Sequence, residues 1–532
     1  MTKLNKKDIL FLVLLVAITG FLFFYKLGSS NLIDMDESRY AESAREMIER
    51  NDYIVPHLND TVRLNKPILF YWFIVLSYKS MGINEFGARF PSALCALLGI
   101  LFVYFFARHI YNRTVGFLAG LILASAPQYL ILSRLAIIDM SFAFFVTLAL
   151  GTFWLGYSST TRKMFFYYIA YFAASCAFLL KGPVGIILFI APPTLYLILI
   201  KNTSELKKLL SWKFLLVFVL INIPWYYAAY ARFGFDNSLD LLYRETIGRY
   251  MGGGIHVHKE PWYFFFLVIA TGFAPWALYL PFALMTYIKK EHTAHKKFLI
   301  VWVSTVFVFF SLCSAKVATY VLPLYPILAI IMAYFWWDIF GNKQKRQHIA
   351  LGIPAALLVI STVVSLFLLP SLLQKYPNYH IQLIFYNCSA IILSLAATLL
   401  YIIKKPRVLF LSVCAITCII VLSLQHLVLP IIEKRRSAKP LAMKLAQKLD
   451  EKDTVISYGP KRYSTVFYTK HPIVLMHEAN KLIEHLNTRK NCYLLIDIDH
   501  FKDLPKETRK TLSLIDQYGD TLLVTNKKKP ER

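Results

Sequence analysis

Long apolar runs separated by short polar connections make up most of this chain of 532 residues. A run of about 18 or more apolar residues with few charges is typical of a helix that crosses a membrane. We therefore predict a mostly α-helical, polytopic membrane protein with about 13 transmembrane helices. The predicted spans are 8–25, 88–108, 114–132, 137–157, 164–180, 183–200, 212–230, 261–287, 298–314, 320–339, 348–369, 383–403 and 408–430.

Two long connections, residues 26–87 and 231–260, interrupt the predicted spans. The first contains a helical pattern from Glu37 to Arg50. Its second part, residues 66–82, is aromatic but carries Lys79, so we expect an amphipathic helix in the membrane interface rather than a span. No small-residue cleavage site follows the first apolar run, which we interpret as an uncleaved span.

The composition changes after Pro430. Residues 437–532 are charged and polar, and four short apolar runs alternate there with helical patterns. This alternation predicts a small soluble α/β domain, and it divides the chain into a transmembrane domain, 1–436, and a C-terminal domain, 437–532. The predicted strands are 455–457, 473–476, 493–496 and 521–525, and the predicted helices are 438–449, 479–486 and 506–514.

The net charge of +27 at first suggests a nucleic-acid partner. However, most Lys and Arg residues flank predicted spans or lie in the last hundred residues, which is the pattern of topology signals. Every second connection is basic, for example 201–213 and 289–297. The positive-inside rule then predicts a cytoplasmic N-terminus, with both long loops and the C-terminal domain outside the cytoplasm, and no nucleic-acid binding.

Charged residues gather in the predicted outer connections, where the nearby membrane makes them costly. Asp36, Glu37 and Arg39 begin the first outer helix, and residues 36 and 39 share one helix face. Capping of that helix by its acids is the structural alternative. Asn65 and Lys66 precede the aromatic segment, where Lys66 is either a phosphate ligand or a lysine that reaches the headgroups.

The later connections add further polar residues at the same predicted face. Arg134 and Asp139 stand at the mouth of the fourth predicted span, as a functional or a structural pair, and Lys181 lies between two spans with almost no loop. Lys316 shares a helix face with Tyr320. His256 and His258 are weak candidates for a metal site, since no acid accompanies them at suitable spacing. A cationic cavity beside lipid suits an anionic phospholipid substrate.

The ordered set of these motifs resembles the bacterial lipid A aminoarabinose transferases (ArnT-like). They belong to the polyprenyl-phosphate-sugar transferases of GT-C fold, which also include the protein O-mannosyltransferases. The resemblance covers the whole membrane region. The matching segments are Asp36-Glu37-Ser38-Arg39-Tyr40, Asn65-Lys66-Pro67, residues 134–139, Lys181-Gly182-Pro183, His258-Lys259-Glu260-Pro261 and residues 314–323.

The resemblance implies an enzyme with an undecaprenyl-phosphate sugar as donor. It implies that Arg39, Lys66 and Tyr320 hold the donor phosphate and that Asp36, Asp139 and Lys181 act in catalysis. Glu37, Asn65, Arg134, His258 and Lys316 would line the same cavity. The aminoarabinose transferases tend to have Glu where this chain has Asn65, which puts in doubt the sugar and any metal that such a Glu would bind.

The expected function is transfer of an amino sugar, such as 4-amino-4-deoxy-L-arabinose, to lipid A at the periplasmic face of a bacterial inner membrane. One alternative is a transferase acting on another lipid, glycan or protein, as the O-mannosyltransferases do. Another is a lipid transporter without chemistry, which the absence of internal repeats disfavours. The expected partners are the lipid donor, the acceptor and bilayer lipids, and the expected state is a monomer. No cofactor is expected with certainty, and a divalent cation is the one considered.

Overall fold

The computed structural model describes residues 4–209, 211–234, 260–289, 293–341, 346–450, 452–489 and 491–527. Their contacts divide the chain into two compact units. The first unit comprises Met1–Tyr25, Leu64–Phe70 and Ser92–Leu427. The second comprises Lys26–Arg63, Tyr71–Pro91 and Val428–Arg532.

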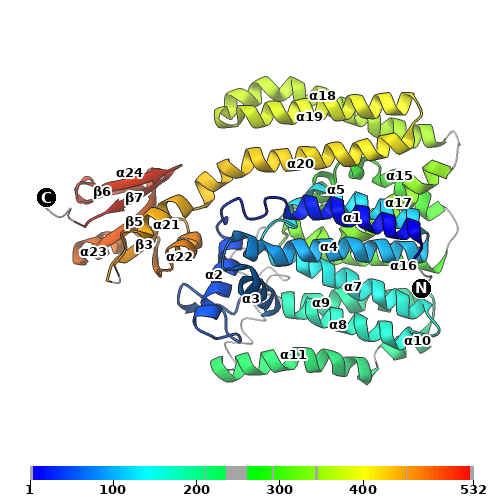
Figure 1. Ribbon diagram of the computed structural model, residues 1–532, viewed down its shortest axis with the longest axis horizontal. Helices are drawn as coiled ribbons and strands as arrows, with labels where there is room; N and C mark the ends of the chain where they lie inside the picture. The colour runs from blue at the N-terminus through cyan, green and yellow to red at the C-terminus, as the bar shows by residue number, and fades with distance from the viewer. Residues whose placement is uncertain are drawn as a thin grey trace. The chain divides into compact units, whose positions relative to one another are not determined.

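The first unit consists almost wholly of helices (Figure 1). Helix α4 (Glu85–Ile110) begins in the second unit, and helix α20 (Pro406–Arg436) ends in it. The other helices of this unit are α1 (Lys6–Phe24), α5 (Arg113–Ser125), α6 (Pro127–Leu132), α7 (Ile138–Ser158), α8 (Lys163–Lys181), α9 (Pro183–Leu199), α10 (Thr203–Leu209), α11 (Trp212–Phe233), α14 (Phe264–Gly272), η2 (Trp276–Leu278), α15 (Leu280–Lys289), α16 (Ala294–Ser311), η3 (Ala318–Leu324), α17 (Tyr325–Gly341), α18 (Arg346–Lys375), η4 (Pro377–Tyr379) and α19 (His380–Ile402).

Ten helical segments in the described part of the chain are long and apolar enough to cross a membrane, and α5 and α9 are shorter apolar helices. The prediction of a polytopic helical protein is thus confirmed, with fewer long spans than the 13 expected. Residues 261–287 do not form one helix, because the turn at Pro275 separates α14 from α15. Residues 114–132 are interrupted at Ala126, whose extended backbone is that expected before Pro127.

Helices α18 and α19 run side by side as an antiparallel pair (Figure 1). Their surface is strongly apolar: Phe367 is 84% exposed, and Val363 and Ile381 are also exposed. An exposed apolar surface of this extent is unfavourable in water and suits contact with lipid chains.

Helix α1 begins with a reciprocal cap, since Asn5 accepts from the Asp8 amide and Asp8 accepts from the Asn5 amide. The Asp8 carboxylate is 1% exposed and also accepts hydrogen bonds from Arg108 and Tyr104 of α4. The same acid therefore starts α1 and ties it to α4.

The second unit combines the first long loop with the C-terminal segment. From the loop come α2 (Asp36–Glu49), a two-stranded ribbon of β1 (His57–Leu58) and β2 (Thr61–Val62), and most of α3 (Leu69–Met81). From the C-terminal segment come α21 (Lys439–Ala446), β3 (Thr454–Tyr458), α22 (Tyr463–Thr469), β4 (Ile473–Met476), α23 (Ala479–Thr488), β5 (Cys492–Asp497), α24 (Ile498–Asp503), α25 (Lys506–Lys510), β6 (Ser513–Tyr518) and β7 (Thr521–Thr525).

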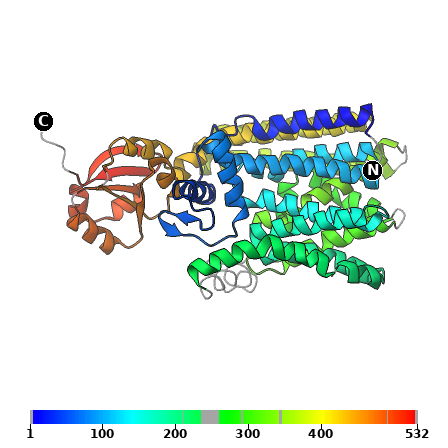
Figure 2. The same cartoon turned by 60° about the horizontal axis from the view of Figure 1, so that its bottom comes forward.

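The C-terminal strands, drawn in orange and red in Figure 2, form a mixed sheet, and their order is β4-β3-β5-β7-β6. Strand β3 is parallel to β4 and β5, whereas β7 is antiparallel to β5 and β6. Helices α21 and α23 cover opposite faces of the sheet, because Leu441 and Leu482 belong to different core clusters. A small C-terminal α/β domain was predicted and is confirmed.

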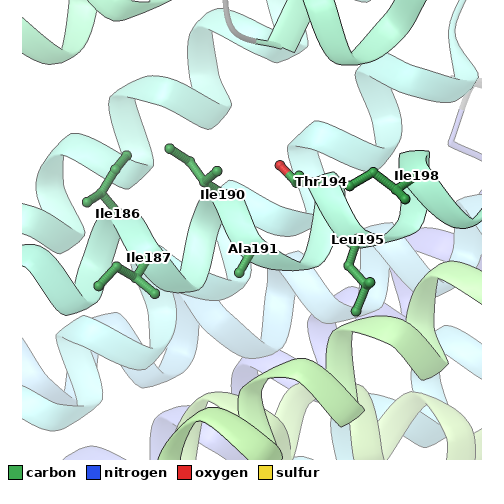
Figure 3. A pocket seen from close by; sticks show the side chains of 7 residues that line it. All are labelled: Ile186, Ile187, Ile190, Ala191, Thr194, Leu195 and Ile198. Atoms are coloured by element: carbon green, nitrogen blue, oxygen red, sulfur yellow. The ribbon is translucent and has the colours of Figure 1, made fainter. Parts of the chain in front are cut away.

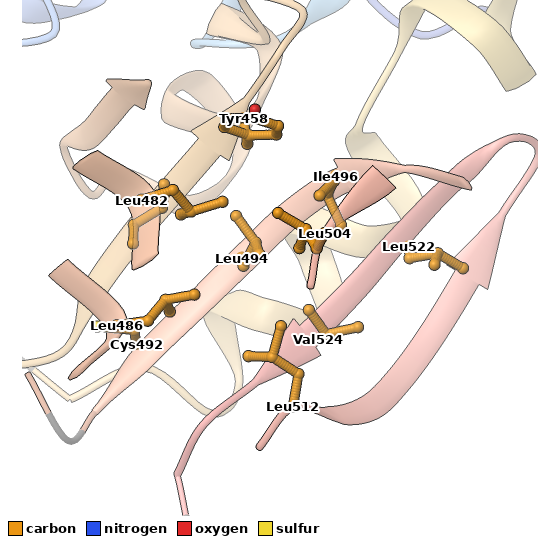
Figure 4. Packing of buried hydrophobic residues seen from close by; sticks show 11 residues of the cluster. Tyr458, Leu482, Leu486, Cys492, Leu494, Ile496, Leu504, Leu512, Leu522 and Val524 are labelled. Carbon is orange, nitrogen blue, oxygen red and sulfur yellow. The ribbon is translucent and has the colours of Figure 1, made fainter. Parts of the chain in front are cut away.

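The alternation of side chains along β5 explains how this small domain has two cores. Leu494 and Ile496 join one cluster (Figure 4), and Tyr493 and Leu495 join the other. Successive residues of a strand point to opposite faces, so an uninterrupted apolar run indicates a strand covered on both sides.

Candidate functional site

The segment Lys181-Gly182-Pro183 joins α8 to α9 with a single residue between the helices. Gly182 has φ +69° and ψ −149°, a backbone conformation open essentially only to glycine. Pro183 opens α9, where a proline is favourable because the first helical amide needs no partner. These two residues fix Lys181 at the last turn of α8.

The Lys181 side chain forms an ion pair with Asp139, in the first turn of α7. Lys181 Nζ lies 2.5 Å from Asp139 Oδ1, and the two side chains are 13% and 14% exposed. Helices α7 and α8 are adjacent, and a lysine at a helix C-terminus and an aspartate at an N-terminus are each favoured by the helix dipole. The ion pair is therefore fixed by both helices, and part of each side chain stays accessible to a ligand.

Two aromatic rings and two polar residues complete this cluster. Lys181 Nζ lies 4.9 Å from the ring centroid of Phe142 and 5.2 Å from that of Tyr320, in η3. The side chain of Thr319 is hydrogen-bonded to Asp139, and the charge of Lys66 also acts on that carboxylate. The structure thus brings together three residues that the sequence singled out, Asp139, Lys181 and Tyr320, and the charge of Lys66 acts on the same carboxylate.

Lys316 and Arg134 have well-defined partners elsewhere in the first unit. Lys316 is 9% exposed and donates to the carbonyl of Glu260 at 3.2 Å. Arg134 is 5% exposed and donates to the carbonyls of Leu22 and Tyr25 at 2.8 and 2.7 Å. Carbonyls at a helix end lack partners within the helix, so Arg134 caps the end of α1. This geometry supports a structural role for Arg134.

Asp36 and Arg39 lie in the second unit, at the start of α2. Their charged groups are 3.9 Å apart, with side chains 80% and 25% exposed. The Arg39 guanidinium lies over the ring of Tyr463, with 5.3 Å between its carbon and the ring centroid. The Arg39 Nε is buried without a hydrogen-bond partner among the described residues. Asp36 is therefore accessible to substrate, and Arg39 has donor capacity left for a ligand.

Arg63 adds a second cation beside aromatic rings in the same unit. Its Nε donates to the Tyr71 hydroxyl at 3.2 Å, and its guanidinium lies 5.9 Å from the ring of Tyr40. The pKa of Arg63 is raised despite a burial effect that lowers it, because partial negative charge on Tyr71 and Tyr40 favours the cation. Arg63 stays positively charged and supplements Arg39.

Glu37 is a buried structural residue in this geometry, 3% exposed. Its two carboxylate oxygens accept from Arg89 at 2.8 and 2.9 Å. Arg89 also donates to the carbonyls of Leu27, Ser30 and Asn31. The pair therefore organises the loop that leads into α2, and it places Glu37 away from solvent.

The remaining predicted site residues are Asn65, His256 and His258. Asn65 is exposed, in the segment Leu64–Phe70 of the first unit. His256 and His258 lie outside the described residues. Within the described ranges there is no group of three His, Cys, Asp or Glu residues that could hold a metal ion.

A shallow apolar groove follows helix α9 (Figure 3). Its lining residues are Ile186, Ile187, Ile190, Ala191, Thr194, Leu195 and Ile198. The groove offers one hydroxyl and no charge, so it suits hydrocarbon and contributes no catalytic group.

Several contributors to these clusters escaped prediction. Thr319 and Phe142 are ordinary residues of apolar segments, and Tyr463 lies more than 400 positions from Arg39 in the sequence. Arg89 had a signal, because an arginine at the start of a predicted span needs a buried partner. For the others the sequence carried no such signal.

The chain is similar to known membrane proteins. The family model "Dolichyl-phosphate-mannose-protein mannosyltransferase" matches residues 8–236. An uncharacterized protein of Aquifex aeolicus is 32% identical over 383 residues, which are 69% of this chain and 74% of that protein. The chain belongs to the dolichyl-phosphate-mannose-protein mannosyltransferase family. The resemblance inferred from the sequence motifs is thereby confirmed.

Two further relatives of the family are informative. The undecaprenyl phosphate-α-4-amino-4-deoxy-L-arabinose arabinosyl transferase 2 of Proteus mirabilis is 31% identical over 361 residues, which are 64% of each chain. The crystal structure of ArnT from Cupriavidus metallidurans bound to undecaprenyl phosphate has a TM-score of 0.79 at 20% identity and covers 97% of both chains. The latter likeness shows that the two share a fold.

The family assignment settles the broad class of activity. The protein is a multi-pass membrane glycosyltransferase of the GT-C type, and its sugar donor is a polyprenyl phosphate sugar. The predicted enzyme class and fold class are both confirmed.

Proposed function

We propose that the protein transfers an amino sugar, in the first instance 4-amino-4-deoxy-L-arabinose, from undecaprenyl phosphate to lipid A at the periplasmic face of the inner membrane. The arabinosyl transferases of Proteus mirabilis and Yersinia enterocolitica, at 31% and 29% identity, support this choice of sugar. The observation that carries the reaction type is the cluster of Lys181, Asp139 and Tyr320, which offers a lipid-borne phosphate a held cation at a helix end.

In this proposal Lys66, Lys181 and Tyr320 bind the donor phosphate, together with Arg39. The bond between the sugar carbon and the phosphate oxygen breaks, and undecaprenyl phosphate leaves as a monoester. Negative charge grows on that phosphate in the transition state, and fixed cations stabilise it. The second observation in favour is the 2.5 Å contact to Asp139, which orients Lys181 before substrate arrives.

Asp36 is the proposed acid at the sugar. Its 80% exposed carboxylate can stabilise positive charge as the sugar becomes oxocarbenium-like. A phosphate of lipid A is already anionic and needs no base to attack the sugar carbon. A hydroxyl acceptor would instead give its proton to Asp36 as the new bond forms.

A second candidate is a transferase that acts on another lipid, a glycan or a protein. Two observations favour it: Asn65 replaces the glutamate that aminoarabinose transferases tend to have, and the matching family model is named for protein mannosyltransfer. The proposed orientation is the same in both cases, with the N-terminus in the cytoplasm and residues 437–532 in the periplasm.

Mass spectrometry of lipid A from a deletion strain tests the lead proposal. We expect the amino-sugar mass to vanish from lipid A, to return with the wild-type chain, and to stay absent with Lys66→Ala. Lys79→Ala is the matched control, because Lys79 lies in the same long loop but contacts the ring of Tyr53. Lipid A that is identical with and without the gene would overturn the lead proposal and favour the second candidate.

A further inference from the structure

The C-terminal domain (residues 437–532) contacts the polypeptide just before α2 at several points within the second unit. The amide of Leu32 donates to the Tyr468 hydroxyl at 3.0 Å, and beside it the amide of Asp34 donates to the carbonyl of Arg436, the last residue of α20, at 2.7 Å. Further along the loop, Asn59 exchanges two hydrogen bonds of 2.7 Å with the backbone of Ile473, at the start of β4. The loop is thus built onto the C-terminal domain by specific polar contacts.

The strongest of these contacts converge on the carboxylate of Asp34, which is 8% exposed. Asp34 Oδ1 accepts from the Ser38 hydroxyl at 2.6 Å and from the Ser464 amide at 2.7 Å. Asp34 Oδ2 accepts from the Ser464 hydroxyl at 2.5 Å. A buried carboxylate is costly unless it is hydrogen-bonded, so these three donors hold it in one place.

The next side chain of the C-terminal domain reaches the neighbouring functional residue. Tyr463 precedes Ser464 at the start of α22, and its ring lies under the guanidinium of Arg39. Two consecutive residues of the C-terminal domain therefore contact the residues that flank Asp36 in the sequence. Ser464 contacts Asp34, and Tyr463 contacts Arg39.

The start of α2 has local contacts, among them the Ser38 hydroxyl on Asp34 and the Ile33 amide on the Glu37 carboxylate, but it lacks an N-cap side chain. Met35 occupies the N-cap position and makes no side-chain capping hydrogen bond. A helix without an N-cap side chain loses about 1 kcal/mol and tends to fray at that end. The position of Asp36, the first helical residue, then depends on contacts with other parts of the chain.

We propose that Ser464 and Tyr463 are positioning residues of the transferase, which fix Asp36 by holding Asp34 and Arg39 at the start of α2. This gives the C-terminal domain a direct part in the reaction, and it rests on the function proposed above for Asp36. A displacement of about 1 Å at a reacting group can reduce a rate by 100-fold, so the loss of these contacts has a measurable effect.

The test compares Ser464→Ala with Thr465→Val in the purified full chain. Ser464→Ala keeps the backbone amide on Asp34 and removes the hydroxyl, which donates to Asp34 and also accepts from the amide of Ala438 at 3.1 Å. The Thr465 hydroxyl is buried with no hydrogen-bond partner among the described residues, so its loss is a matched control in the same helix. We expect Ser464→Ala to lower kcat for donor turnover by roughly 10- to 100-fold with little change in KM, and Ser464→Thr to restore it.

Tyr463 offers a second, chemically distinct comparison. Tyr463→Phe keeps the ring under Arg39 and is expected to retain activity, whereas Tyr463→Ala removes the ring and is expected to reduce kcat. A role limited to folding would lower the thermal midpoint and the amount of active enzyme without this separation of kcat from KM.

Amide hydrogen exchange of residues 34–40 tests the positioning contact without any measurement of activity. We expect faster amide exchange in Ser464→Ala than in Thr465→Val. Unchanged exchange would overturn the positioning role, whatever the activity. Faster exchange in a protein that turns over no polyprenyl phosphate sugar would leave the positioning contact in place and refute the proposed function instead.

Discussion

Lys181, a residue of the proposed donor site, is held by several neighbours. Its ammonium group has a carboxylate at 2.5 Å and two aromatic rings within about 5 Å, while 13% of the side chain stays exposed. The rings restrict where the cation can move, and Asp139 supplies an acceptor that a phosphate oxygen can replace. An ordinary surface lysine would lose more side-chain entropy on binding.

We expect Lys181→Ala to lower kcat/KM for the donor by roughly 100-fold, because a fixed cation that faces developing charge is removed. Steady-state assays of purified protein provide the measurement. Adding Asp139→Ala to Lys181→Ala should then cost little more, since the carboxylate has lost the partner that it orients. A second loss of similar size would show that Asp139 acts on the substrate independently.

Asp36 belongs to a different class of residue, because its exposed carboxylate is free to reach a substrate. Purified Asp36→Asn protein should bind donor with nearly unchanged affinity and should not turn it over. Donor binding measured by a thermal shift, beside a turnover assay, separates the two effects. Retained turnover would exclude Asp36 as an essential acid.

The pH dependence of stability is expected to report on Asp34. Burial raises the pKa of its carboxyl to about 6, although hydrogen bonds from Ser38 and Ser464 and the charge of Arg462 act in the other direction. The folded state then binds a proton that the unfolded chain has released, between about pH 4 and pH 6. Stability contributed by this group falls as the pH rises through that window.

Thermal unfolding of the wild type and of Asp34→Asn between pH 4.5 and 7.5 measures this contribution. As the pH rises, the thermal midpoint of the wild type should fall relative to that of Asp34→Asn, because only the wild type loses a proton at this position. A difference between the two midpoints that is constant with pH would mean that Asp34 keeps an ordinary pKa in the folded protein.

Sequence alone singled out charged residues near lipid, but it could not separate those that stay exposed from those that are buried against another part of the chain. Asp36, Lys66 and Lys181 stood out because charge beside lipid is costly. Glu37 stood out for the same reason, but its carboxylate is buried against Arg89 and organises the loop. In a sequence, a charged residue that binds a ligand cannot be told from one that pairs with another residue of the protein. The structure separates the two cases because it shows the partner.

At the scale of elements, the connection of α8 to α9 determines where Lys181 lies. Gly182→Ala places a side chain at φ +69° and ψ −149°, which costs about 1–3 kcal/mol or displaces the end of α8. We expect lower stability and a clear loss of kcat. Gly234→Ala is the matched control, because Gly234 ends α11 at φ +79° and ψ +161°, and a Cβ added there would meet no atom of the described residues within 4 Å.

Both glycine variants should lower the thermal midpoint, and only Gly182→Ala should impair turnover per folded molecule. Equal turnover per folded molecule in Gly182→Ala and Gly234→Ala would show that the reaction does not depend on the exact position of the end of α8.

The prediction of elements was accurate where an apolar pattern was continuous. Strands β3, β4, β5 and β7 all match predicted runs. Residues 506–514 were predicted as one helix, which is wrong, because α25 ends at Lys510 and β6 begins at Ser513. Strand β6 is an edge strand with mostly exposed or half-buried residues, so it has little apolar pattern of its own.

At the scale of the whole molecule, the donor is a lipid that carries a phosphate, and the proposed site assigns recognition of that phosphate to the cationic residues. Undecaprenyl phosphate should therefore raise the thermal midpoint of the purified protein in a concentration-dependent way, as a ligand of the folded state does. Undecaprenol, which has the same chain without the phosphate, should have a much smaller effect. Equal effects of the two would assign recognition to the hydrocarbon alone.

The second unit contains segments from near both ends of the chain, so it can be completed only late in biosynthesis. Asp34 is bonded to Ser464, which is 430 positions later in the chain. At about 5–20 residues per second, a ribosome needs roughly 20 to 90 s to make the polypeptide between them. During that interval Asp34 has the Ser38 hydroxyl as a donor but lacks both donors from Ser464. A chain that stops before residue 464 would therefore contain every cationic residue proposed for the donor phosphate, yet it would lack the contact between Asp34 and Ser464, and under the proposed positioning role it would be inactive.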